Sequence, residues 1–220
     1  MKKILSILIF FAFIINASAQ SNSLGKNDPE AKKILDAVSN KFKTYKSLKG
    51  NFILEIKDAN GKIQGTKKGK LMMKGNKYAI SLTGQEIMCD GKNVWTYDQA
   101  ANEVQLDKFD PNGSTLSPQK LFTNFYDKDF LYMLRGLKKV GTKTLQEVEL
   151  TPTDKTKSFF KVLVTVEKSE NMITNTQIFE KNGNRFAYEM NNVVTNATLG
   201  DELFVFDLKK YKGIEVIDIR

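Results

Sequence analysis

The chain has 220 residues, 41% of them apolar and 27% charged, which is the composition of a folded protein large enough for one sizeable β domain. Its single cysteine and complete lack of histidine exclude Ser-His-Asp and Cys-His catalysis, histidine-containing zinc sites and an internal disulfide. The formal net charge is +9, and the lysines are scattered without a dense basic run. This pattern is typical of a solvated basic surface, and among functional interpretations it suits weak attraction to anionic lipid or acidic partners better than nucleic-acid binding.

Residues 1–19 have the pattern of a signal peptide. Lys2 and Lys3 precede an apolar run over residues 4–15, and the small residues Ala17-Ser18-Ala19 follow it. A run of twelve residues is too short to span a bilayer comfortably. We therefore expect an exported, soluble protein that is cleaved near Ala19 and whose residues 20–220 form a single domain.

A helix is predicted to begin at Pro29. Asp28 suits the N-cap position, and proline is favoured in the first turn of a helix. The apolar residues that follow recur at helical spacing and form one stripe: Ala31, Ile34, Leu35, Val38 and Phe42. This stripe indicates either a helix that covers a core or, more specifically, a movable lid over a cavity.

The next segment, residues 52–106, predicts a meander of short antiparallel strands. Apolar residues alternate over 52–56 and 78–82, and Asp90-Gly91 marks a tight hairpin because such turns need a positive φ angle. Pairing across this hairpin divides its apolar residues between two faces, with Ile87, Cys89 and Val94 on one and Met88 and Trp95 on the other. We therefore expect part of the outer face to be covered, and Cys89 to be a buried apolar residue rather than a reactive thiol.

The second half of the chain predicts one more helix and further strands. Ser117-Pro118 is expected to open the helix, with Leu121, Phe122 and Phe125 on one side. Apolar alternation then predicts two strand faces, Phe160 with Val162, Val164 and Val166, and Phe186 with Tyr188 and Met190. The apolar segments Leu203–Phe206 and Ile214–Ile219 close the chain. About 11 strands result, which indicates a mainly β (α+β) fold with one large curled antiparallel sheet.

The order of these motifs resembles that of one family. After the first helix come GKLMMKGNKYAI, IMCDGKNVWTYDQAANEV, LSPQKLF and a terminal FVFDLKKYKGIEVIDIR. Their order and spacing are similar to those of LolA-type proteins, the periplasmic carriers of outer-membrane lipoproteins, over nearly all of the mature chain. The most specific parts are Asp90-Gly91-Lys92 followed by Trp95 and Tyr97, and the Ser117-Pro118 helix start.

The resemblance implies an unclosed β-barrel whose concave face is apolar and covered by helices that act as a lid. It also implies a carrier that receives acylated lipoproteins from an ATP-driven inner-membrane transporter and delivers them to the outer membrane, where a receptor is a further candidate partner. We expect a monomer. Family members commonly carry an arginine after the strand that matches residues 71–74, where it holds the lid closed. Here Lys74-Gly75 occupy that place, so we expect a weaker lid lock or one built from other groups.

Acyl chains are expected to bind an apolar surface formed by the sheet and the Ser117 helix. The candidate residues are Phe52, Leu54, Met73, Tyr78, Ile80, Met88, Trp95, Leu121, Phe122 and Phe125. Methionine suits ligands of variable shape because its side chain is unbranched and polarisable. Ordinary core packing is the alternative interpretation of the methionines.

Two other classes of function remain as alternatives. Glu147 and Glu149 share a strand face, and a carboxylate pair can do acid–base work, but alternating charge on a solvated strand face is far more common. Without a nucleophile motif we expect no enzyme, no catalytic residue, no metal site and no cofactor. The second alternative is a regulatory module that senses lipid or lipoprotein on the same fold, which the sequence separates poorly from a carrier.

Overall fold

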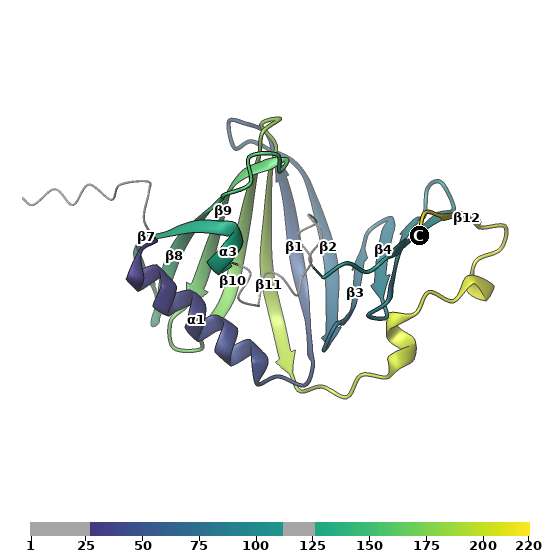
Figure 1. Cartoon of the computed structure of the whole chain (residues 1–220), viewed down its shortest axis with the longest axis horizontal. Coiled ribbons are helices and arrows are strands. Elements are labelled where there is room, and N and C mark those ends of the chain that lie inside the picture. The colour runs from purple at the N-terminus through teal and green to yellow at the C-terminus, as the bar shows by residue number, and fades with distance from the viewer. Residues whose placement is uncertain (1–26, 112–125) are drawn as a thin grey trace, which may run out of the picture.

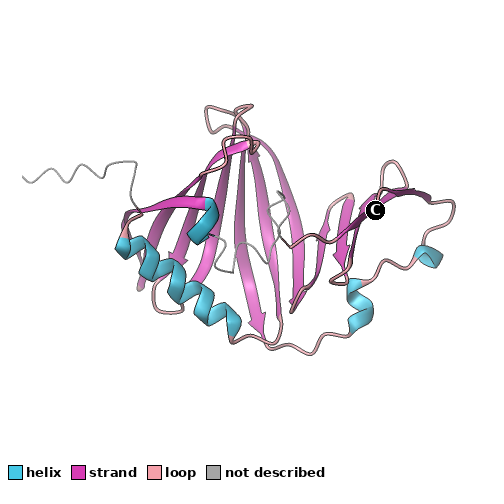
Figure 2. Cartoon of the chain, in the orientation of Figure 1, coloured by secondary structure: helices cyan, strands magenta, loops and turns pink. Residues whose placement is uncertain are grey.

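The computed structural model describes residues 27–111 and 126–220, which form one twelve-stranded sheet with a helix lying across one of its faces (Figures 1 and 2). The helical elements are α1 (Pro29–Lys43), α3 (Tyr126–Asp129) and the 3-10 helices η1 (Asp201–Phe204) and η2 (Leu208–Lys210). The strands are β1 (Leu48–Lys57), β2 (Ile63–Lys74), β3 (Lys77–Leu82), β4 (Gln85–Cys89), β5 (Asn93–Asp98), β6 (Glu103–Lys108), β7 (Phe130–Val140), β8 (Lys143–Pro152), β9 (Phe159–Glu167), β10 (Met172–Glu180), β11 (Arg185–Thr195) and β12 (Glu215–Asp218).

The sheet is open, with the strand order β12-β6-β5-β4-β3-β2-β1-β11-β10-β9-β8-β7. Strand β12 runs parallel to β6, and the pairs from β6 through to β7 are antiparallel. The long pairing of β1 with β11 joins two meanders, β1–β6 and β7–β11. Because β7 and β12 are separate edges, the barrel does not close, as the sequence predicted (Figure 1).

Alternation along the strands gives the sheet two distinct faces. On β1, Leu48, Phe52 and Leu54 are buried, whereas Lys49 and Asn51 between them are exposed. The apolar stripe of α1 packs against the same side of the sheet as the buried residues of β1, in one continuous cluster. We call the side that α1 covers the inner face and the opposite side the outer face.

The outer face of β2–β6 is covered by the C-terminal segment, residues 197–214. Phe204 is fully buried there with Leu199 and Ala79, and Met72 and Met88 pack against them. A second cluster joins Phe206 to Tyr97 and Val104, and it includes Trp95 and Tyr211. The prediction that part of the outer face is covered is thus confirmed, and the covering layer comes from the end of the chain.

Two features of the strands differ from the predictions. Leu203–Phe206 is not a strand. Its first two residues belong to the 3-10 helix η1, and Phe204 and Phe206 pack onto the outer face as part of a covering layer without pairing to a strand. Residues 130–140, for which no strand was predicted, form the edge strand β7.

Phe160 does not belong to the inner row of β9. Its side chain is 48% exposed, whereas Phe159 is 8% exposed and packs within the main core. The cause is a shift of pairing register between β9 and β10. Phe179 pairs with Lys161, but the next residue of β10, Glu180, pairs with Phe159, so the pairing skips Phe160. A one-residue irregularity of this kind exchanges the faces of the residues beyond it.

The predicted signal peptide (1–19) and the predicted helix after Ser117, with Leu121, Phe122 and Phe125, lie outside the described residues.

Cys89 ends β4 with its side chain completely buried, as predicted, and burial raises the pKa of its thiol to about 11. We therefore expect the thiol of the native protein to react with an aromatic disulfide reagent at pH 8 at least about tenfold more slowly than that of the unfolded protein. The release of the coloured thiolate measures both rates. Equal rates in the native and the unfolded protein would contradict the burial of Cys89.

Candidate functional site

An apolar surface that is not fully buried extends along the inner face beside the region covered by α1. Nine side chains from six strands form it, and we call this set the inner wall: Ile56, Ile80, Leu82, Ile87, Val94, Ile178, Phe186, Tyr188 and Met190. Cross-strand pairing explains why they share a face, since Leu54 lies opposite Tyr188 and Ile56 lies opposite Phe186. The wall therefore offers aliphatic, aromatic and thioether groups and no charged side chain.

Phe52 lies buried next to the inner wall, and a glycine on the neighbouring strand β2 leaves space for its ring. Gly69 is the direct pairing partner of Phe52, and a Cβ at position 69 would lie within 3.0 Å of three ring atoms. The Phe52 ring also contacts Tyr188, with ring centroids 6.1 Å apart. The glycine thus lets a large aromatic ring lie across β2 and join the two meanders on the inner face.

Five of the predicted lipid-binding residues lie together on the inner face. Phe52, Leu54, Met73 and Tyr78 are buried in its core, and Ile80 belongs to the inner wall.

The structure corrects the placement of Met88 and Trp95. They pair with each other across the β4–β5 hairpin and lie on the outer face, beneath the C-terminal segment. Their neighbours Ile87 and Val94 face inward, because side chains alternate with a period of two along a strand. Met88 and Trp95 are therefore core residues of the outer layer and do not join the inner wall.

Eight of the nine members of the inner wall were not among the candidates: Ile56, Leu82, Ile87, Val94, Ile178, Phe186, Tyr188 and Met190. The alternation over residues 186–190 did predict an apolar face. What the sequence lacked was the pairing of β11 with β1, which brings this face beside Phe52 and Leu54.

Asp28 fastens the start of α1 to the edge strand β7. Its Oδ1 accepts a hydrogen bond from the Glu30 amide at 2.8 Å, and its Oδ2 accepts one from the Leu134 amide at 3.0 Å. These hydrogen bonds lower the pKa of the Asp28 carboxyl, and the bond from the Leu134 amide has the largest effect. The Asp28 amide in turn donates to the Tyr132 carbonyl at 3.0 Å. The N-cap predicted from sequence therefore also serves as the joint between α1 and the sheet.

A second set of polar contacts joins the middle of α1 to the region around α3. The Tyr126 hydroxyl donates to Asp36 at 2.6 Å, and Lys32 lies 3.1 Å from Asp36 and 3.4 Å from Asp127. Burial and the bond to Asp36 raise the pKa of Tyr126. Among the described residues, the polar contacts that attach α1 to the sheet and to α3 therefore come from Asp28, Lys32 and Asp36 and not from an arginine.

Lys74, which occupies the place of the family's arginine, contacts the outer layer. Its Nζ donates to the Leu199 carbonyl at 3.0 Å and to Asp201 Oδ1 at 2.9 Å, and Lys77 Nζ lies 2.8 Å from Asp201 Oδ2. Hydrogen bonds from Lys77 and Lys74 lower the pKa of Asp201 to about 2. This clasp holds the C-terminal segment against β2 and β3.

Asp201→Asn is expected to loosen the C-terminal segment, because it removes the anion between Lys74 and Lys77. Amide exchange at Leu203, which donates to the Gly200 carbonyl, should become faster in the variant. Since the pKa of Asp201 is lowered in the folded state, the clasp is present above its ordinary value of 3.8 and is lost as the pH falls toward about 2. Unchanged exchange at Leu203 in the variant would contradict this role.

A comparison with protein-family models assigns the chain to one family. The model described as "Outer membrane lipoprotein carrier protein LolA" matches residues 43–207. The chain belongs to the LolA family. The predicted resemblance is confirmed, and the family description is that of a carrier.

Solved structures resemble the chain at low sequence identity. An uncharacterized conserved protein from Thermus thermophilus has a TM-score of 0.58 and 10% identity, and the match covers 86% of this chain and 99% of that one. A LolA superfamily protein from Nitrosomonas europaea has a TM-score of 0.43 and 15% identity, over 80% of this chain and 98% of that one. A putative outer membrane lipoprotein-sorting protein domain from Vibrio parahaemolyticus has a TM-score of 0.43 and 12% identity, over 79% and 97%. No curated protein matches the chain.

Across residues 27–111 and 126–220, no three histidine, cysteine, aspartate or glutamate side chains gather where they could hold a metal ion. Glu149 is engaged in an ion pair with Arg135 at 3.6 Å. No helix in the described part of the chain is long and apolar enough to cross a membrane.

Proposed function

We propose that this LolA-family protein carries lipoproteins by binding their acyl chains on the inner wall. The observation that carries the proposal is the set of nine apolar side chains on one face, none of them charged and none fully buried. Apolar side chains that the fold leaves partly exposed on one face can serve a soluble protein as a ligand or partner site. Met190 and the aromatic rings of Phe186 and Tyr188 suit a flexible hydrocarbon chain, because they adapt to irregular shapes.

The energetics of acyl transfer define the kind of partner that such a carrier needs. Removing one chain of roughly 15 methylenes from water contributes about 12 kcal/mol at ~0.8 kcal/mol per group. The bilayer offers an equally apolar environment, so transfer from membrane to carrier has a net free energy near zero. Transfer in either direction therefore has almost no driving force of its own. Net movement from one membrane to the other then requires an energy source at the loading step, which supports an ATP-driven inner-membrane transporter as the donor and the outer membrane, or a receptor on it, as the acceptor.

The remaining parts of the proposal concern location and the lid. The pattern of residues 1–19 supports export and cleavage near Ala19, so that a monomeric carrier acts in the periplasm. Helix α1 acts as the lid. It is joined to the sheet by its apolar stripe and by a small number of polar contacts from Asp28, Asp36 and Lys32. An arriving acyl chain competes with that stripe for the same inner face.

Mass spectrometry of the protein purified from the periplasm tests the proposed function. We expect acylated peptides or lipoproteins to accompany the native protein and to be absent after extraction with detergent. A protein that carries no acylated species and forms a stable complex with one membrane regulator would contradict the carrier and support the sensing module.

A further inference from the structure

A polar hollow lies on the outer face of the sheet, on the side opposite the inner wall. Its volume is about 560 Å³, and it spans β11, β1, β2 and β3. Six polar side chains line it, and we call it the outer hollow: Asn51, Lys68, Lys70, Ser81, Thr83 and Asn191. No carboxylate is among its lining residues.

Strand register explains how these side chains come together. Asn191 pairs with Asn51, Asn51 with Lys70, and Lys70 with Ser81, so four strands contribute one continuous row. At about 4.8 Å between neighbouring strands, the row spans roughly 14 Å. Lys68 and Thr83 stand two positions from Lys70 and Ser81, so they face the same side.

The polar groups of the outer hollow are not used by the fold. Among the described residues, none of the six side chains makes a hydrogen bond or an ion pair with another protein group. Two ammonium groups, two amides and two hydroxyls therefore remain available to one ligand. Both lysines are exposed, so a ligand can reach them from solvent.

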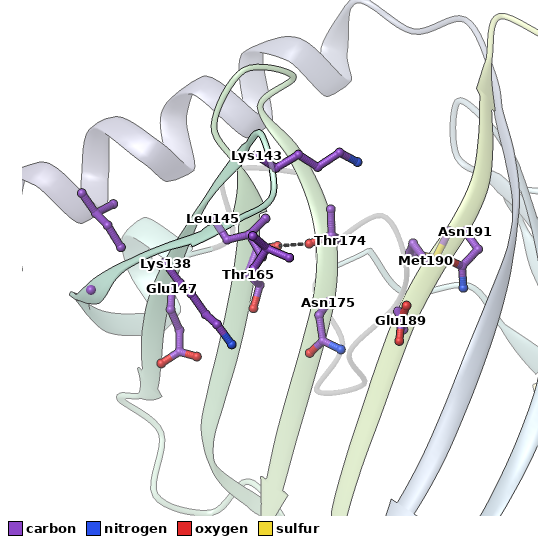
Figure 3. Close-up of a pocket in the computed structure, with 13 residues that line it drawn as sticks. Lys138, Lys143, Leu145, Glu147, Thr165, Thr174, Asn175, Glu189, Met190 and Asn191 are labelled. Atoms are coloured by element: carbon purple, nitrogen blue, oxygen red, sulfur yellow. Dashed lines mark hydrogen bonds between the residues drawn. The ribbon is translucent and has the colours of Figure 1, made fainter.

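A neighbouring hollow on the same sheet has a different charge balance. Its volume is about 640 Å³, and Lys138 and Lys143 line it together with Glu147 and Glu189. Figure 3 shows these carboxylates on either side of Asn175, and it shows Asn191, which lines both hollows. Because the carboxylates offset the lysines there, only the outer hollow of these two has a lining with net positive charge.

We propose that the outer hollow binds a phosphate-bearing group, either of a lipid headgroup or of a free phosphorylated solute. Lysine ammonium groups act as point charges for phosphate oxygens, and the hydroxyls and amides supply further donors. The polar side chains of the outer hollow come from alternate positions of the strands and face away from the inner wall, although Leu82 of the inner wall and Phe52 also line the hollow.

Nuclear magnetic resonance titration of the folded full-length protein with inorganic phosphate and with glycerol 3-phosphate tests the proposal. We expect amide shifts near Asn51, Lys70 and Ser81. The double variant Lys68→Gln/Lys70→Gln should weaken binding by about tenfold or more, since two charge-assisted contacts are lost. The matched control Lys138→Gln/Lys143→Gln removes the same charge from the neighbouring hollow and should leave the affinity unchanged.

Vesicles distinguish the two sources of phosphate. Sedimentation with phosphatidylcholine vesicles that contain phosphatidylglycerol, lost in the Lys68→Gln/Lys70→Gln variant, would assign the site to a lipid headgroup. Binding of glycerol 3-phosphate without sedimentation would assign it to a free solute. The proposal is overturned if neither probe binds, or if both double variants weaken binding equally, because general surface charge then accounts for the effect.

Discussion

Ile178→Glu is expected to abolish acyl binding while the sheet remains folded. Ile178 belongs to the inner wall and pairs with Phe186 and Val162, yet it is not fully buried, so a carboxylate there can still reach water in the free protein. A bound acyl chain would bury that carboxylate without a partner, at a cost of several kcal/mol. We expect the affinity for a triacylated lipopeptide to fall by at least about 100-fold, measured by titration calorimetry.

The neighbouring residue supplies a matched control for Ile178→Glu. Gln177 precedes it on β10 and faces the opposite side, so Gln177→Glu adds the same charge to the same strand on the outer face. This control should bind the lipopeptide normally. If Ile178→Glu binds as well as the control, the acyl site lies elsewhere. If both variants lose binding, the effect comes from charge and not from the inner wall.

Gly69→Ala should destabilise the protein although it adds only one methyl group. The new Cβ would lie within 3.0 Å of three ring atoms of Phe52, which is itself only 6% exposed and has little room to move. Overpacking of this kind costs about 1–3 kcal/mol of unfolding free energy. Urea denaturation followed by circular dichroism measures the loss, which should appear as a lower midpoint with an unchanged slope.

A double-mutant cycle identifies the source of that loss. Phe52→Ala alone should cost about 3–5 kcal/mol, because it leaves a cavity on the inner face. In the double variant Gly69→Ala/Phe52→Ala, the added methyl meets no ring, so the total cost should be smaller than the sum of the two single costs. Additive costs would show that Gly69 is needed for a reason other than the Phe52 ring.

Local patterns in the sequence predicted much of this fold. The N-cap at Asp28 and the apolar stripe behind it predicted α1, because both signals lie within one helix. The Asp90-Gly91 turn predicted the faces of the β4–β5 hairpin, and the observed pairing of Cys89 with Val94 and of Met88 with Trp95 agrees with them. The motif order then predicted the LolA family and its open sheet, which the family match and the structure confirm.

Features that depend on distant parts of the chain were not predictable from such patterns. The alternating apolar residues of the C-terminal segment look like a strand, and only the packing of Phe204 and Phe206 on the outer face shows a covering layer. Met88 and Trp95 were wrongly grouped with the inner residues. The local sequence around the β4–β5 hairpin does not show which of its two faces the C-terminal segment covers. The attachment of α1 joins Asp28 to Leu134, 106 residues apart, and no local signal reports such a contact.

Methyl resonances of the isoleucine residues test the central proposal most directly, because the two faces of the sheet carry separate reporters. Ile80, Ile87 and Ile178 belong to the inner wall, whereas Ile53 lines the outer hollow. On addition of a triacylated lipopeptide to the folded protein, we predict that the three inner-wall methyl signals shift and that the Ile53 signal does not. Shifts confined to Ile53, or no shift at any of these methyl groups, would contradict acyl binding on the inner wall.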